Sequence, residues 1–211
     1  MTTATANNTV LAWHTLPANK KTTNGEGIEV TPGQTLRLPD GVKPDLCKRG
    51  YHASVKALDL LKNYVAGPIW CRVELGGTIV YGDTKCVASE RTCIAMVDGT
   101  KVLQRFAIWC AEQALNAIDQ DKVDTRSREA LRVAALYIDG KATAKEISDA
   151  SYAASYASYA SDASYVASHA AADASHASHA ACYASHASHA SYAAPNEKLE
   201  AMLLEAMNIR E

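Results

Sequence analysis

An alanine-rich repeat over residues about 150–194 constrains the fold of this chain more than any other feature. Small residues alternate there with tyrosine or histidine, as in "ASYASYASDASYVASHA". Alanine has the highest helix propensity of all residues but buries little apolar area. The repeat is therefore expected to be helical, and the main core must come from the first 140 residues. Disorder is the alternative for such a low-complexity tract.

The spacing of the larger residues in the repeat does not match one face of a straight helix. These residues, which include Asp162 and Asp173, take twelve steps to cover the forty residues from 152 to 192. The mean step is about 3.3 residues, shorter than the 3.6-residue helical turn, so the stripe drifts by roughly 320°. The segment is expected to wind left-handedly around a neighbour or to break into shorter helices. The expected interaction residues are Tyr152, Tyr156, Tyr159, Tyr165, His169, His176, His179, Tyr183, His186, His189 and Tyr192.

Histidine pairs in the repeat raise the alternative of a metal binder. His176 with His179, and His186 with His189, are three residues apart and can face one way. Two imidazoles at this spacing can bind zinc, nickel or copper, but no acidic residue completes a ligand set. Histidine also suits a repeat position that favours a flat, hydrogen-bonding ring, so we expect no metal. Joint protonation of these histidines near pH 6 would make assembly depend on pH.

The first 98 residues are predicted to form a small, mostly antiparallel sheet with one helix. Hydrophobic runs bounded by turn residues predict strands over 9–16, 28–38, 67–83 and 85–97. The third run is expected to be a hairpin turning at Gly76-Gly77. Helical spacing predicts a helix over 54–64, with Ser54 as its N-cap.

Helices are predicted for the remainder of the chain. Two amphipathic patterns, at 99–118 and 124–140, predict a pair of helices, the second closed by Gly140. The sequence "TAKE" at 143–146 is a capping box that opens the helix leading into the repeat. Pro195 is expected to break the repeat before a terminal helix.

Composition limits the classes of partner. The chain has 21 basic and 23 acidic residues and a formal net charge of −2. This balance argues against nucleic-acid binding on electrostatic grounds and gives no sign of a membrane-binding surface. The six cysteines form no CxxC pair and mostly lie in apolar runs, which indicates reduced, buried thiols in a cytosolic protein. The sequence shows neither a signal peptide nor a membrane-spanning run.

Two motifs lie near the N-terminus: Trp13-His14, and a Cys-x-x-Gly-x-His-Ala-Ser turn over 47–54. They are followed by "IWCRVELGGTIVYGDTKCVASERT", "VLQRFAIWCAEQAL" and the alanine-rich tail. With these motifs the chain resembles a family of uncharacterised phage and prophage proteins, and the resemblance covers nearly its whole length. It implies a viral or prophage origin, in the host cytoplasm or in the virion, and no particular activity.

The same region faintly resembles ADP-ribosyltransferases, which use a histidine, a tyrosine and a glutamate in this order. That resemblance implies that His14 and Tyr51 hold a nicotinamide ribose and ring, and that Glu90 polarises a hydroxyl. The spacing is short, and no "HGT" follows Trp13. The simpler interpretation is that His14 and His52 are core or turn histidines with satisfied hydrogen bonds, with Ser54 part of the same turn.

These patterns together predict an α+β fold in four parts: an α+β domain at 1–98, a two-helix segment at 99–140, the repeat at 141–194 and an amphipathic helix at 195–211. The leading functional hypothesis is a phage-related interaction or assembly protein, without a cofactor. Its repeat would pack closely against copies of itself or a protein partner. The alternatives are a nucleotide-binding enzyme, with NAD as the candidate ligand, and a histidine-repeat metal binder.

Overall fold

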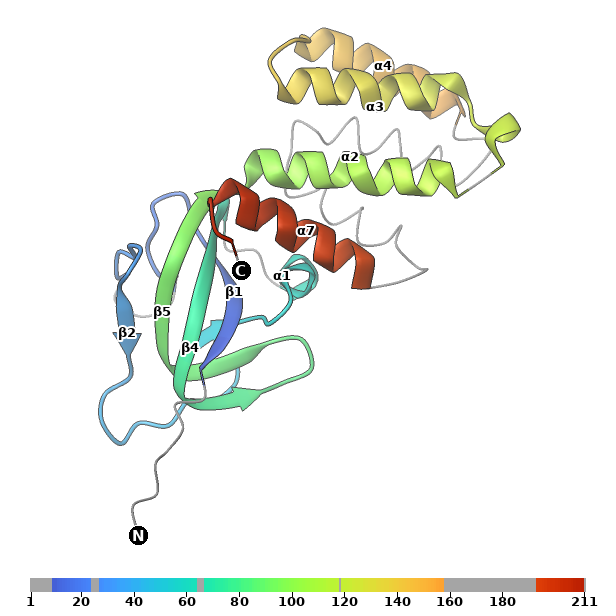
Figure 1. Ribbon diagram of the computed structural model, residues 1–211. Helices are drawn as coiled ribbons and strands as arrows, with labels where there is room; N and C mark the ends of the chain where they lie inside the picture. The colour runs from blue at the N-terminus through green and yellow to red at the C-terminus, as the bar shows by residue number, and fades with distance from the viewer. Residues whose placement is uncertain (1–8, 24–26, 64–66, 118, 158–192, 211) are drawn as a thin grey trace. The chain divides into compact units, whose positions relative to one another are not determined.

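The computed structural model describes residues 9–23, 27–63, 67–117, 119–157 and 193–210 (Figure 1). The chain divides into two compact units. The first contains residues 1–99 and 203–211, and the second contains residues 100–202. The first unit carries the sheet and the second carries helices, which confirms the α+β class.

The sheet of the first unit is built on two long neighbouring strands. They are β4 (Ile69–Tyr81) and β5 (Cys86–Asp98), paired antiparallel along their length. Three shorter strands add to them, all antiparallel: β1 (Val10–Leu16) on β4, and β2 (Thr35–Arg37) and β3 (Tyr51–Ala53) on β5. The strand order is β1-β4-β5-β2, with β3 beside β5.

The segment after β3 returns to β1, so the sheet curls around its own core. The backbone N–H of Trp13 donates to the carbonyl of Ser54 at 2.7 Å, and the N–H of Ser54 donates back at 2.9 Å. Ser54 is therefore a bridge residue and not the expected N-cap. The helix that follows, α1, spans Ala57–Asn63. Its later start follows from this pairing, because the backbone of Ser54 is held extended beside a strand.

The predicted hairpin at Gly76-Gly77 is wrong, because β4 runs through both glycines as one strand. Gly77 has φ +69°, and the pairing with β5 slips between Gly76 and Ile79. A glycine at positive φ lets a strand absorb extra residues as a bulge. The chain reverses between Tyr81 and Cys86 instead, where the Gly82 N–H donates to the Lys85 carbonyl at 2.8 Å.

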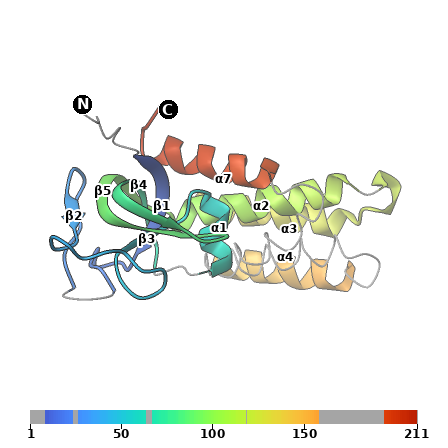
Figure 2. The same cartoon turned by 90° about the horizontal axis from the view of Figure 1, so that it is seen from below.

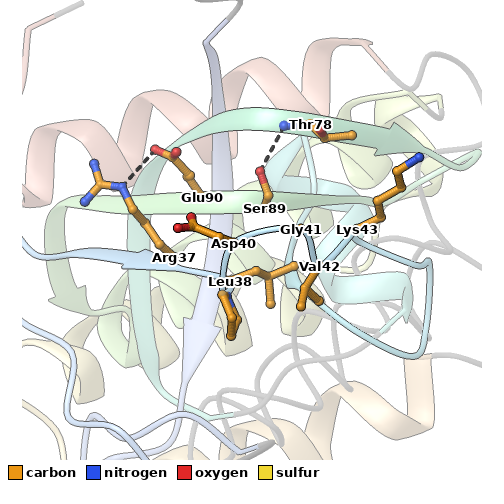
Figure 3. A pocket seen from close by; sticks show the side chains of 10 residues that line it. Arg37, Leu38, Asp40, Gly41, Val42, Lys43, Thr78, Ser89 and Glu90 are labelled. Atoms are coloured by element: carbon orange, nitrogen blue, oxygen red, sulfur yellow. Dashed lines mark hydrogen bonds and ion pairs between the residues drawn. The ribbon is translucent and has the colours of Figure 1, made fainter.

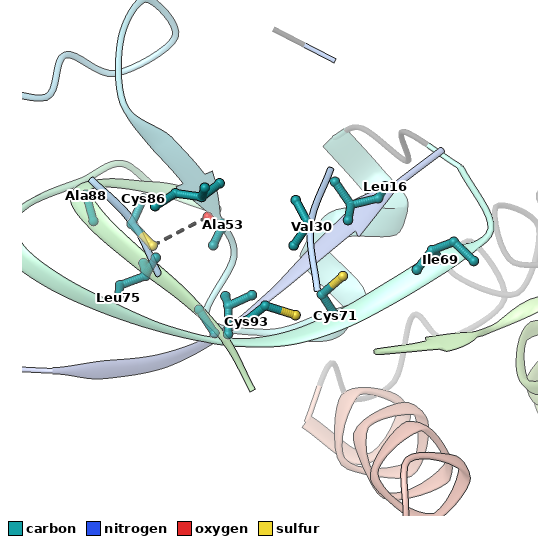
Figure 4. Close-up of a cluster of buried hydrophobic side chains, with 12 residues drawn as sticks. Leu16, Val30, Ala53, Ile69, Cys71, Leu75, Cys86, Ala88 and Cys93 are labelled. Atoms are coloured by element: carbon teal, nitrogen blue, oxygen red, sulfur yellow. Dashed lines mark hydrogen bonds between the residues drawn. The ribbon is translucent and has the colours of Figure 1, made fainter. Parts of the chain in front are cut away.

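The core of the first unit lies inside the curled sheet. It is lined by small and medium-sized side chains, several of them cysteines (Figure 4). The buried members are Ala12, Leu16, Val30, Leu36, Ala53, Ile69, Cys71, Val73, Leu75, Cys86, Ala88 and Cys93. Cys47 is exposed, whereas the described strand cysteines are buried and reduced.

The second unit contains helices that run side by side (Figure 2). They are α2 (Thr100–Asn116), the short 3-10 turn η1 (Gln120–Lys122), α3 (Thr125–Ile138) and α4 (Ala144–Ala157). Asp124 caps α3 by accepting from the Arg126 N–H at 2.8 Å. Gly140, at φ +71°, follows its end as predicted.

The capping box that opens α4 is confirmed. The Thr143 N–H donates to a Glu146 carboxylate oxygen at 2.7 Å, and the Glu146 N–H donates to the Thr143 hydroxyl at 3.2 Å. The hydrogen bonds to Thr143 also lower the pKa of the Glu146 carboxyl. The helix carries the first units of the repeat up to residue 157. The expected continuation over 158–192 lies outside the described residues.

The terminal helix, α7, spans Ala193–Ala206 and starts two residues before the expected break. Pro195 lies in its first turn, where a missing N–H costs no helical hydrogen bond. The division between the two units falls inside this helix. Among the described residues, no helix is both long and apolar enough to cross a bilayer.

Candidate functional site

The three residues singled out from the sequence lie on three different strands. His14 is on β1, Tyr51 on β3 and Glu90 on β5. His14 and Tyr51 are both close to Arg91, a buried arginine that sequence analysis did not single out. Glu90, as the strand neighbour of Arg91, points to the opposite face of β5.

Arg91 is the most unusual side chain of the first unit. It is only 5% exposed, and within the described part of the chain no carboxylate lies at ion-pair distance from it. One guanidinium N–H group donates to the backbone carbonyl of His52 at 2.9 Å, and the cation lies 5.5 Å from the centre of the Tyr51 ring. Burial lowers the pKa of Arg91 to about 10.

His14 contributes a neutral imidazole next to this cation. Burial, and then the positive charge of Arg91, hold the pKa of His14 well below its usual value. A hydrogen bond to the His52 backbone opposes these effects but is weaker than they are. His14 also pairs directly with Cys71 across β1 and β4, so both side chains share the face that lines the core.

The low pKa of His14 predicts that the sheet unit loses stability in mild acid. The unfolded chain takes up a proton near pH 6.5, whereas folded His14 stays neutral until a lower pH, so the loss begins below 6.5. The free energy of unfolding should fall by at most about 1.4 kcal/mol per pH unit from this residue. Urea unfolding of the full chain between pH 7 and pH 5 measures the slope, and His14→Gln should reduce it. Equal slopes for the two proteins would contradict this.

Tyr51 is anchored at both ends. Its hydroxyl donates to the backbone carbonyl of Arg37 at 3.1 Å, and its ring lies against the Arg91 cation. A cation over an aromatic ring is stabilised by roughly 1 to 2 kcal/mol when it is desolvated. Tyr51 therefore holds Arg91 in place and is not free to receive a ligand without giving up these contacts.

Glu90 belongs to a separate, shallow pocket of about 340 Å³ (Figure 3). Its carboxylate pairs with the Arg37 guanidinium at 3.2 Å. Asp40 and Lys43 line the same pocket, so charges of both signs face it. The hydroxyl of Ser89 is occupied by the Thr78 N–H at 2.9 Å. Glu90 is thus not placed to act together with His14.

His52 closes the tight turn that precedes β3. Its Nε2 atom accepts from the Cys47 N–H at 2.9 Å, and burial lowers the pKa of the ring, which keeps this nitrogen unprotonated. Cys47 has φ +66° and Gly50 has φ +117°. The Cys-x-x-Gly-x-His motif is therefore explained by the geometry of a turn.

The sequence did not single out Arg91, because in "ASERTCIAMV" it directly follows Glu90 and the local pattern does not show which of the two charged residues faces the core. The register supplies what the sequence lacks: Arg91 lies opposite Leu75, and Cys93 lies opposite Val73. Both therefore share the core-facing side of β5. A charged residue at an inward position of an apolar strand is the signal that would have found it.

Comparison with known protein families, curated proteins and solved structures gives no match, so the functional argument rests on the side chains themselves. The cluster around Arg91 brings together a buried cation, a neutral imidazole and an aromatic ring. In the described residues, no group of three or more histidine, cysteine or acidic side chains is arranged to hold a metal ion. The histidine pairs of the repeat lie outside the described residues.

Proposed function

We propose that the protein is an interaction or assembly protein, phage-related as its motifs imply, whose alanine-rich repeat makes close helix contacts with a copy of itself or with a protein partner. The observation that carries this proposal is the packing of α4, which contains the start of the repeat. Ala154 is fully buried in the cluster that α4 forms with α3, and Ala150 packs against the same cluster. Tyr152, in contrast, is 66% exposed.

The buried positions of α4 define a face that the sequence continues. Ile147, Ala150 and Ala154 follow steps of three and four residues, the spacing of a helix-contact seam. Continued at the same alternation through residue 185, these steps meet only alanine, serine or cysteine. The positions are Ala157, Ser161, Ser164, Ser168, Ala171, Ser175, Ser178, Cys182 and Ser185.

A face of this kind favours a partner at short range. Small side chains let two helix backbones approach closely, and van der Waals contact then extends along the whole seam. The tyrosine and histidine positions from 156 to 186 fall outside this series, which meets His189 and Tyr192 only at its next two steps.

Sedimentation velocity of the full chain over a wide concentration range tests self-association. Ser164→Leu combined with Ser168→Leu fills the small face without adding charge, and overpacking of about 1 to 3 kcal/mol should weaken association at least about fivefold. Ala163→Leu combined with Ala170→Leu is the matched control, because these positions lie outside the series. A wild-type chain that is monomeric at every concentration, or equal weakening by both pairs, would contradict self-association through this face.

A second candidate function is the binding of a nucleotide or a similar anion by the sheet unit. The observation that favours it is Arg91, a buried cation without a described carboxylate partner. NAD or ADP should raise the melting temperature of the wild-type chain and leave that of Arg91→Met unchanged. If neither ligand shifts the wild-type chain, nucleotide binding is wrong.

A further inference from the structure

We propose that Cys71 and Cys93 form a buried dithiol that a small peroxide oxidises to a cross-strand disulfide, with Cys93 as the attacking thiolate and Cys71 as the resolving thiol. The proposal does not depend on the function proposed above. It rests on the register of β4 and β5, on the contact between the two sulfurs and on the position of Arg91.

The two thiols belong to neighbouring strands and meet on the core face. Cys93 lies opposite Val73, and Cys71 is two residues from Val73 on the same face of β4. The Cys71 thiol interacts with the Cys93 sulfur, whose own S–H group donates to the backbone carbonyl of Ala95 at 3.7 Å. Figure 4 shows the sulfur of Cys93 directed toward Cys71. Both residues are buried, so a small oxidant such as a peroxide is hindered less than a bulky thiol.

The electrostatics of the pair separate the roles of its members. The hydrogen bond from Cys71 and the charge of Arg91 lower the pKa of Cys93. The same hydrogen bond, together with burial, raises the pKa of Cys71. A thiolate is the nucleophilic form of cysteine, so Cys93 is the member prepared to attack. The positive charge of Arg91 interacts with both sulfurs and can therefore balance the negative charge of a Cys93 thiolate.

The chemistry balances with hydrogen peroxide as the oxidant. The Cys93 thiolate attacks one peroxide oxygen and breaks the O–O bond, giving a sulfenic acid and hydroxide, which takes up the proton that Cys93 had lost. The Cys71 sulfur then attacks the sulfenic sulfur, and its proton leaves with the hydroxyl as water. Overall, two thiols and one peroxide give one disulfide and two waters.

The final bond requires a small movement of the strands. Diagonal neighbours on antiparallel strands have Cα atoms about 7 to 8 Å apart, slightly beyond the usual range of a disulfide. The pairing of β4 with β5 is irregular between Arg72 and Val73, within the same stretch. A bulge interrupts the regular ladder and gives the backbone local freedom. The strands therefore need to move at a point where the hydrogen bonding between β4 and β5 is already irregular.

Peptide mapping of the full chain tests the proposal without any mutation. The protein is treated with hydrogen peroxide, unfolded, alkylated and cut with trypsin, which places Cys71, Cys86 and Cys93 in three separate peptides, residues 63–72, 86–91 and 92–101. The expected product joins the first and third peptides and is reversed by dithiothreitol. Cys86, which is buried in the same core and donates to the Ala53 carbonyl at 3.4 Å, should stay fully alkylated.

Variants then assign the two roles. In Cys71→Ser, dimedone should trap a sulfenic acid on residue 93, and in Cys93→Ser, Cys71 should remain alkylatable. Cys86→Ser is the matched control, and it should form the 71–93 disulfide as the wild-type chain does. The proposal is overturned if Cys71 and Cys93 of the wild-type chain both remain alkylatable after the exposed Cys47 has been oxidised. It is also overturned if Cys93 is oxidised while Cys71 stays free.

Discussion

Replacing Gly50 with alanine is expected to destabilise the sheet unit by about 3 kcal/mol or more. Gly50 has φ +117°, a conformation that costs other residues about 1 to 3 kcal/mol. An added Cβ would also lie 2.7 Å from a methyl group of Val87 and 3.0 Å from the carbonyl oxygen of Ala88. Overpacking of this kind adds about 1 to 3 kcal/mol. Because β3 pairs with β5 at these residues, the clash would move the strand that carries Tyr51.

Gly41→Ala is the matched control for this substitution. Gly41 also has positive φ, at +77°, but nothing lies within 4 Å of the added Cβ. It should therefore show the backbone cost alone, and the difference between the two variants isolates the clash. Urea unfolding measures both. Equal losses of stability would mean that Gly50 matters for its backbone conformation and not for the close approach to β5.

Arg91→Met is expected to stabilise the protein, by about 1 to 3 kcal/mol, although it removes a buried contact. The fold disfavours the charged guanidinium, as the lowered pKa of about 10 indicates, and no described carboxylate compensates for its loss of water. Apolar side chains of similar volume often replace buried charges at no cost or with a gain. The His52 carbonyl still has the hydrogen bond from His14. Methionine also keeps the flexible volume that fills the core.

Arg72→Met is the control. Arg72 is also buried, but its cation lies 4.6 Å from the centre of the Trp13 ring, closer than the 5.5 Å between Arg91 and the Tyr51 ring. Losing that cation–ring contact should cost about 2 kcal/mol. The opposite signs for the two arginines are measurable by chemical unfolding at neutral pH. A loss of more than about 2 kcal/mol in Arg91→Met would show that Arg91 supports the fold. A gain would show that the chain retains Arg91 at a cost in stability, which is the pattern of a functional residue.

Local patterns predicted much of the fold because local physics decides it. The capping box at Thr143 and Glu146 is formed by residues within one turn, and it is present as predicted. Gly140 and the edges of β1 and β5 follow from similarly short-range preferences. The hairpin at Gly76-Gly77 was wrong because a glycine pair fits a bulge as well as a turn, and only the partner strand decides between them.

The candidate site depended on register, which a single sequence does not contain. Cys71, Arg91 and Cys93 lie up to 22 residues apart in the chain and meet only because Val73 is opposite Cys93. A shift of one residue would turn Arg91 to the other face. His14 and Tyr51 were found from the sequence because their side chains are distinctive. Arg91, the common neighbour of both, was not found from the sequence, because its role depends on contacts from three strands.

The length of β4 and β5 has a consequence for how the sheet opens. Each of the shorter strands pairs with one of these two, and β4 and β5 pair with each other over thirteen-residue strands. The two central strands therefore cannot separate without dividing the whole sheet into two parts. Their amide protons should exchange with solvent only through opening of the whole sheet, at one shared free energy. The short strands β2 and β3 can open individually and exchange sooner.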